Sequence, residues 1–258
     1  ELPAARRRAG GMLRRLPRSR RIPAIACAPS PRYRSDSSSS TSSSSSCAPL
    51  ADVFAASVAE TSRVPITRVA HEIWRRQRRE PGDDYVDLTV GHAKDTVVLA
   101  RMANEGEGGG RVFGFDIQNI HQASANLKSE LSPSEYGSVE LHEMCHSLIQ
   151  DVLPPAPESR VAIVVGNLGY LPGAESDKTV KTQPETTIVA LRQAAALLRP
   201  GGIISLLCYV GHEGGALEHQ SVLKEAERLQ DSGSYSFYHF DRSPLCPKLV
   251  IVQKNCVN

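Results

Sequence analysis

Residues 161–165, VAIVV, form an unbroken apolar run near the middle of the chain. A strand is apolar at every position when other layers cover both faces of its sheet, which is the usual situation of a parallel strand. Residues 203–209 predict a second buried strand, and residues 186–198 between the two carry a helical pattern. We expect this helix to be ended by Pro200-Gly201-Gly202. The segment therefore predicts a strand–helix–strand unit and a parallel sheet.

The same alternation continues in both directions from this unit. We expect further strands at residues 85–89, 111–115, 139–141, 235–240 and 249–252, and helices at residues 64–74, 95–104, 117–131 and 216–229. The last two strands are joined by a connection too short for a crossover helix, so they must run antiparallel. The predicted fold class is α/β and Rossmann-like, with a mainly parallel seven-stranded sheet and a C-terminal antiparallel strand pair. By analogy this is the layout of class I methyltransferases.

The length and charge of the chain limit what it can be. It has 258 residues, enough for one large domain, and its 40% hydrophobic and 22% charged residues are ordinary values for a globular protein. Ten Arg and one acid lie in residues 1–34, which leaves 20 basic and 27 acidic residues elsewhere, a net charge of −7. This disfavours a protein that coats nucleic acid by broad attraction. No stretch approaches the roughly 18 apolar residues of a membrane span, which excludes a transmembrane helix.

Residues 1–50 differ in composition from the rest of the chain. A part rich in Arg, Pro and Ala is followed by an almost pure Ser run at residues 35–46. Such a segment cannot bury enough apolar surface to offset its ordering entropy. An Arg-rich, Ser-rich and acid-poor composition is typical of a transit peptide for chloroplast or mitochondrion, with a generic disordered basic tail as the alternative. We expect Met12 to be the natural start and residues 51–258 to form one folded domain.

The loop after the first strand, which we expect to be the central strand, predicts a ligand site. Its sequence is DLTVGHAKDT, residues 87–96, and it lacks the G-x-G-x-x-G and Walker patterns of phosphate-binding loops. The acids Asp87 and Asp95 would repel phosphates but suit a cation such as the sulfonium and amino group of S-adenosylmethionine. Asp116, at the end of the second strand, can accept both ribose hydroxyls. For Asp95 a helix-capping role is the alternative.

Seven motifs together resemble one known family. They are DLTVGHAKDT (87–96), GFDIQ (114–118), CHSL (145–148), VGNLGYLPG (165–173), SDKTVKTQPETT (176–187), LRPGG (198–202) and YVGHEGG (209–215). Through them the chain from about residue 64 to residue 254 resembles the bacterial and plant tRNA 5-aminomethyl-2-thiouridine methyltransferases, formerly named as rRNA methylases. The resemblance implies S-adenosylmethionine as cofactor, tRNA as substrate and a plant organellar type of enzyme.

The resemblance also implies a place for each matched residue. Around the cofactor it implies Asp87, Thr89, Gly91, His92, Asp95 and Thr96 at the methionine part, Asp116 and Gln118 at the ribose and adenine, Cys145 and His146 at the adenine, and Asn167, Leu168 and Gly169 beside the reacting methyl group. On the substrate side it implies Lys178, Tyr209, Gly211, His212, Gly214 and Gly215.

The chemistry of methyl transfer to an amine indicates which residues near the reacting methyl group are candidates for catalysis. The transfer is an in-line displacement, so positioning supplies most of the effect. An aminomethyl group is largely protonated at neutral pH and must first lose a proton. Asn167 and Tyr170 lie in a polar loop that can orient a neutral amine, and His212 or Tyr209 can help to remove the proton. For the two tyrosines, a half-buried aromatic ring at a strand end is the alternative.

We expect the tRNA to be held at its anticodon loop, because loop bases can be splayed out and stacked on aromatic rings. Tyr170 and Tyr209 are suitable rings. The basic cluster at residues 75–79, which includes Arg75 and Arg76, could hold flanking phosphates. A solvated helix end, where Arg suits the helix dipole, explains the same cluster equally well. The sequence does not define the oligomeric state and leaves a homodimer open.

One motif favours a different class of protein. Residues 142–146, HEMCH, match H-E-x-x-H, in which two histidines on one helix face bind zinc and the glutamate is the base. The short strand at residues 139–141 puts the motif at a strand end, so we predict no metal site and keep a zinc metalloprotease as a distant alternative. Nearer alternatives are a methyltransferase acting on rRNA, a protein or a small molecule, and a catalytically silent binding protein. The acidic loop and Asn167 argue against the silent protein.

Overall fold

The computed structural model describes residues 50, 52–53, 56, 64–105, 109–118, 120–156, 158–173, 177–244 and 246–256. Almost all of the predicted leader lies outside these residues, so the leader and the domain boundary at residue 50 stay predictions. Among the described residues, no helix is both long and apolar enough to cross a bilayer.

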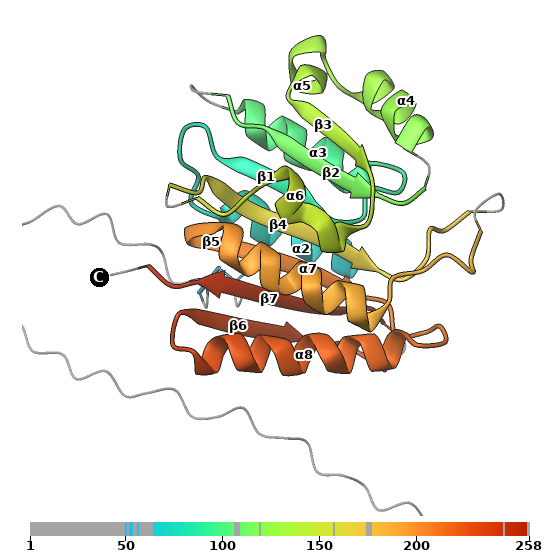
Figure 1. Ribbon diagram of the computed structural model, residues 1–258, viewed down its shortest axis with the longest axis vertical. Helices are drawn as coiled ribbons and strands as arrows, with labels where there is room; N and C mark the ends of the chain where they lie inside the picture. The colour runs from blue at the N-terminus through green and yellow to red at the C-terminus, as the bar shows by residue number, and fades with distance from the viewer. Residues whose placement is uncertain are drawn as a thin grey trace, which may run out of the picture. The chain divides into compact units, whose positions relative to one another are not determined.

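The described residues contain one seven-stranded sheet with the strand order β3-β2-β1-β4-β5-β7-β6 (Figure 1). The strands are β1 (Asp84–Asp87), β2 (Val112–Asp116), β3 (Val139–Glu143), β4 (Val161–Leu168), β5 (Leu198–Cys208), β6 (Tyr235–Phe240) and β7 (Lys248–Lys254). All neighbours from β3 to β5 pair in parallel, whereas β7 is antiparallel to both β5 and β6. This confirms the predicted fold class.

The middle position of the sheet belongs to β4 and not, as predicted, to β1. The reason is that the antiparallel pair β7 and β6 extends the sheet beyond β5, which moves its centre by one strand. Strand β1 still lies between β2 and β4, so the chain changes direction across the sheet at this point. The carboxyl ends of β1 and β4 therefore form the topological switch point, where open α/β sheets bind ligands.

Helices cover both faces of the sheet (Figure 1). They are α2 (Ile66–Arg76), α3 (Lys94–Asn104), α4 (Ile120–Glu130), α5 (Pro133–Gly137), the 3₁₀ helix η1 (His146–Leu148), α6 (Ile149–Val152), α7 (Pro184–Leu197) and α8 (Gly215–Asp231). One apolar core joins α2, α3 and α4 to the sheet, and a second joins α6, α7 and α8 to the other face. Successive residues of β5 alternate between them, since Ile203 belongs to the first core and Ile204 to the second.

Several elements differ from the sequence-based expectation: η1 and α6 were not predicted, and two further differences concern α7 and α5. Helix α7 ends at Leu197, before the Pro-Gly-Gly segment, and β5 already begins at Leu198. A Cβ at Gly202 would lie 3.0 Å from the carbonyl oxygen of Val161, so this glycine lets β5 lie close to β4 rather than ending the helix. Helix α5 was not predicted, although Ser132 and Glu135 form a capping box before it.

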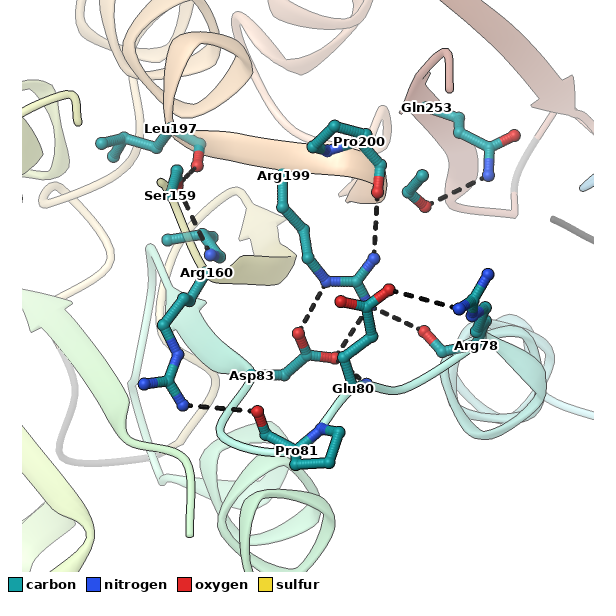
Figure 2. A network of polar contacts seen from close by, with 12 residues as sticks. Arg78, Glu80, Pro81, Asp83, Ser159, Arg160, Leu197, Arg199, Pro200 and Gln253 are labelled. Atoms are coloured by element: carbon teal, nitrogen blue, oxygen red, sulfur yellow. Dashed lines mark hydrogen bonds and ion pairs between the residues drawn. The ribbon is translucent and has the colours of Figure 1, made fainter. Parts of the chain in front are cut away.

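At the amino ends of the strands, a buried ion pair ties β5 to the connection between α2 and β1 (Figure 2). The guanidinium of Arg199 donates from Nε to Asp83 Oδ1 at 2.6 Å and from Nη2 to Asp83 Oδ2 at 2.8 Å. It also donates to the carbonyl oxygens of Arg78 and Pro200, at 2.8 and 3.0 Å. The exposed fractions of the Arg199 and Asp83 side chains are 8% and 4%. Burial removes the water that would otherwise solvate the two charges, so each is stabilised by the other, and loss of one partner would leave a buried charge uncompensated.

Candidate active site

A cavity of about 710 Å³ opens at the carboxyl ends of the five parallel strands. The segments that line it follow β1 (residues 88–92), end or follow β2 (116–118), follow β3 (144–146), end or follow β4 (167, 169–172) and follow β5 (209–212). Helix α2 contributes Thr67 and His71. The cavity therefore lies where the topology predicts a ligand site.

Asp87 is the last residue of β1, and it is buried beneath the loop that joins β1 to α3. Its side chain is fully buried and accepts hydrogen bonds from the Thr96 hydroxyl at 2.7 Å and the Thr89 amide at 3.1 Å. Burial, together with the nearby charge of Asp95, raises the pKa of Asp87 to about 7. Asp87 and Thr96, both predicted cofactor residues, are not among the cavity-lining residues. They support the loop from behind, whereas Thr89, Gly91 and Asp95 line the cavity.

The raised pKa of Asp87 predicts a pH-dependent stability. The folded protein keeps the proton up to a pH of about 7, whereas an unfolded chain releases it near the ordinary value of 3.8. This group's contribution to stability is therefore complete below pH 3.8 and is lost as the pH rises through 7. We expect Asp87→Asn to raise the melting temperature at pH 8 and to change it much less at pH 4. Thermal unfolding at both values measures this, with exposed Asp231→Asn on α8 as control. An equal shift at both would contradict it.

Gly91 and Asp116 join the loop to the end of β2. Asp116 Oδ2 accepts the Gly91 amide at 2.8 Å, and its Oδ1 accepts the Gln118 amide at 3.0 Å. Burial raises the pKa of Asp116. Gly91 has a φ of +50°, and a Cβ there would lie 2.8 Å from Leu171 Cδ1. The backbone conformation at this position favours glycine, and a side chain here would displace the end of the Leu171 side chain.

Asp95 is held from two sides by residues distant in sequence. Its Oδ1 lies 2.6 Å from His71 Nε2, and its Oδ2 accepts the Asn167 side-chain amide at 2.6 Å. The backbone amide of Asn167 donates to Thr89 Oγ1 at 2.7 Å. All four residues line the cavity. The structure therefore brings α2, the β1–α3 loop and the end of β4 together around one carboxylate.

His212 lies on the β5 side of the same cavity. Its Nδ1 is 3.0 Å from the carbonyl oxygen of Glu213, so Nδ1–H donates and Nε2 is left as an acceptor. Among the described residues, nothing hydrogen-bonds to this buried Nε2. The ring contacts Tyr170 edge-on, with ring centroids 5.7 Å apart. Tyr170 and Tyr209 are 40% and 39% exposed, and burial, aided by the Asp95 charge, raises the pKa of Tyr209.

His146 and Cys145 close the β3 side of the cavity. His146 Nδ1 lies 3.3 Å from the carbonyl oxygen of Leu88, and burial lowers the pKa of His146, so the ring is neutral. Its buried Nε2 is a second acceptor to which no group among the described residues donates. Ser147 donates to Cys145 Sγ at 3.1 Å. His146 and His212 thus both line the cavity, and each has a buried Nε2 without a hydrogen-bond partner among the described residues.

Several predicted residues lie outside the cavity lining. Leu168 is buried within β4, and Lys178 has its Nζ 5.8 Å from the Tyr170 ring centroid. Arg75 and Arg76 end α2, whereas Thr67 in its first turn and His71 in its middle line the cavity. The basic cluster continues into the connection between α2 and β1. In this connection the Arg78 carbonyl oxygen accepts a hydrogen bond from Arg199, at the end of the sheet opposite the cavity. This placement favours a solvated helix end over a phosphate contact.

The H-E-x-x-H motif does not form a zinc site of the protease type. His142 and Glu143 belong to β3 and His146 to η1, so the two histidines do not share one helix face. His142 stacks on Phe115 with ring centroids 5.0 Å apart. Among the described residues, no group of three or more His, Cys, Asp or Glu could hold a metal ion.

Comparison with known proteins assigns this chain to a family. Residues 112–254 match the model of a family described as "Putative rRNA methylase". A protein of Arabidopsis thaliana named tRNA (mnm(5)s(2)U34)-methyltransferase, chloroplastic, is 37% identical over 211 residues, which cover 80% of this chain and 74% of the relative. The chain belongs to the rRNA methylase family.

Solved structures agree with membership of the rRNA methylase family. A Clostridium thermocellum protein named as an rRNA-methylase is 35% identical, with a TM-score of 0.59 over 68% of this chain and 90% of that protein. A Streptococcus mutans protein named as a methyltransferase, in complex with SAH, is 24% identical. Its TM-score is 0.60 over 74% of this chain and 98% of that protein, which supports the fold.

The region matched to the rRNA methylase family contains Asp116, His146, Asn167 and His212 but not His71. His71, the α2 residue that contacts Asp95, was not among the residues predicted from the sequence. A signal was present, because Thr67 and His71 are four residues apart and so share one polar face of the predicted helix. The sequence could not show that this face turns toward the ligand site.

Proposed function

We propose that the chain is an S-adenosylmethionine-dependent methyltransferase that methylates the aminomethyl group of a modified wobble uridine in tRNA. The observation that carries the proposal is the presence of Asp95 and Asp116 in one cavity, with Asn167 held against Asp95. Asp95 suits the positively charged part of the cofactor, Asp116 suits its ribose hydroxyls, and a fixed amide suits an amine acceptor. The name of the Arabidopsis relative supports the choice of tRNA.

The cavity fits the cofactor in size and in its hydrogen-bonding groups. Its volume of about 710 Å³ is within the usual range for small-molecule sites. Asp116 uses one lone pair of each oxygen on backbone amides and keeps others for two ribose hydroxyls. We assign His146, which lines the cavity after β3, to the adenine side of the cofactor. When bound, the cofactor supplies a methyl group carried on a sulfonium.

The residues near Asn167 can prepare an amine acceptor. Asp95 holds the Asn167 NH₂ group, so the side-chain carbonyl oxygen is available to accept an N–H of the amine. His212 lines the cavity beside Tyr170, and we assign to it the removal of the proton that an ammonium must lose. The partly exposed rings of Tyr170 and Tyr209 can stack on a splayed-out base. We assign the catalytic roles to Asn167, Tyr170 and His212 on this basis.

The binding of tRNA is proposed to be local. With a net charge of −7 outside the basic leader, the protein cannot hold RNA by bulk attraction. We therefore assign recognition to one nucleotide of the anticodon loop, with Lys178 beside Tyr170 as a proposed phosphate contact. A homodimer stays a prediction.

A methylation assay tests the proposed function. The purified protein is incubated with labelled S-adenosylmethionine and tRNA whose wobble uridine carries either an aminomethyl group or no modification. We expect methylation of the aminomethyl nucleoside alone, identified by mass spectrometry. Parallel reactions with rRNA and a protein extract cover the alternatives. Methylation of rRNA or protein in preference to tRNA would contradict the assignment of tRNA as the substrate, but the assignment of the cofactor would remain.

Asp116→Ala tests the cofactor site separately. Loss of the carboxylate removes the acceptor of the ribose hydroxyls, and we expect the affinity for S-adenosylmethionine to fall by more than about tenfold, or about 1.4 kcal/mol. Calorimetry measures it, with Asp231→Ala on α8 as the control. An unchanged dissociation constant would remove Asp116 from the site.

Import into an organelle is the proposed localisation. The Arabidopsis relative is named as chloroplastic, and residues 1–50 have the composition of a transit peptide. A fluorescent fusion of residues 12–60 is expected to enter chloroplasts or mitochondria, and co-localisation with a marker of each distinguishes them. A diffuse cytosolic signal would contradict the proposal.

A further inference from the structure

The contact between His71 and Asp95 has no part in the function proposed above. His71 comes from α2, outside the region matched to the family, yet it lines the same cavity as Asn167. Its ring packs beside Trp74, with ring centroids 4.7 Å apart, and Trp74 is buried. The imidazole is therefore held in place on a helix that is itself anchored in the core.

The two hydrogen bonds of Asp95 determine which way the Asn167 amide faces. A carboxylate only accepts hydrogen bonds, so His71 Nε2 must donate to Oδ1 and Asn167 Nδ2 must donate to Oδ2. Both bonds are 2.6 Å long, and the His71 and Asp95 side chains are only 19% and 12% exposed. With one N–H of its NH₂ group donated to Asp95, the amide turns its carbonyl oxygen away from Asp95, and this oxygen is the only atom of the amide that can accept an N–H of a ligand.

We infer that His71 is a positioning residue for the acceptor amine. It fixes the carboxylate of Asp95, which fixes the amide of Asn167, whose carbonyl oxygen orients an N–H of the amine. The inference rests on the proposed function, because it names the acceptor group. Its physical basis is that in-line displacement is sensitive to small errors in the position of the attacking atom. Without His71, Asp95 has one fewer donor and can rotate away from Asn167.

Steady-state kinetics of two His71 variants test this role. His71→Ala removes the donor, and we expect kcat to fall about tenfold while the KM for S-adenosylmethionine stays within about threefold. His71→Gln keeps an N–H donor at similar reach and is expected to restore most of kcat. The control is Glu72→Gln on the same helix, whose partner Arg76 is remote from the cavity lining. Equal losses in the Ala and Gln variants would overturn the inference.

A double variant and a spectrum separate this role from simple support of α2. In an Asn167→Ala background, adding His71→Ala is expected to cause no further loss of kcat, because the two act in series. In ¹⁵N-labelled protein, His71→Ala is expected to shift the side-chain amide resonances of Asn167, whereas His71→Gln and Glu72→Gln leave them in place. Additive losses or unshifted resonances would overturn the inference. If the wild-type protein methylates no tRNA, the proposed function fails, and the spectrum still decides whether His71 fixes Asn167.

Discussion

Asn167→Ala is expected to lower the turnover of tRNA methylation by about 100-fold, the usual cost of removing one group that orients the transition state. The side chain spans Asp95 and the proposed position of the acceptor amine. Its truncation leaves the amine without an oriented acceptor for its N–H, but it removes little from the binding of the cofactor. We therefore expect the dissociation constant for S-adenosylmethionine to change by only a few-fold, which is the pattern of an interaction realised mainly in the transition state.

Single-turnover kinetics and calorimetry together decide this prediction. The matched control is Asn104→Ala on α3, because Asn104 bonds to the Ala100 carbonyl and to Ser138, away from the cavity. The control should keep wild-type turnover. If Asn167→Ala weakens cofactor binding as much as it lowers turnover, Asn167 is a cofactor residue and not an acceptor-orienting one. Unchanged turnover would remove it from the site altogether.

Asp83→Ala is expected to cost about 3 to 5 kcal/mol of folding free energy, because it leaves Arg199 as an uncompensated buried charge. The pair is linked by two short hydrogen bonds and is almost inaccessible to water. It joins the start of β5 to the segment before β1, two places that are 116 positions apart in the sequence. Denaturant unfolding measures the loss, and activity per folded molecule should be retained, since the network lies at the opposite end of the strands from the cavity.

The double variant Asp83→Ala/Arg199→Met gives the sharper test. Removing both charges leaves no buried ion without a partner, so the double variant should be less destabilised than Asp83→Ala alone. The control is Arg101→Ala, whose partner Glu130 lies 3.8 Å away in a pair with side chains 50% and 62% exposed. It should cost less than about 1 kcal/mol. Destabilisation of Asp83→Ala as small as that of the control would contradict the prediction.

The sequence by itself determined the strands, the long helices and the class of fold. The apolar run of β4 required two covered faces, and the short connection between β6 and β7 required an antiparallel pair. It also determined the edge of the sheet where ligand residues gather, because Asp116 and Asn167 end parallel strands. These features depend on residues that are close together in the sequence, within one helix or strand and its connection. Hydrophobic periodicity and segment length therefore reveal them.

Only the tertiary structure decided which side chains meet. His71 and Asp95 are 24 positions apart and Asn167 and Asp95 are 72 apart, and no local pattern encodes either contact. The structure likewise placed Asp87 behind the loop and the basic cluster of α2 away from the cavity. Such contacts depend on how far each helix is rotated and shifted as it packs on the sheet. These rotations and shifts are determined by how side chains pack in the two apolar cores. Each core contains residues from segments that are far apart in the sequence.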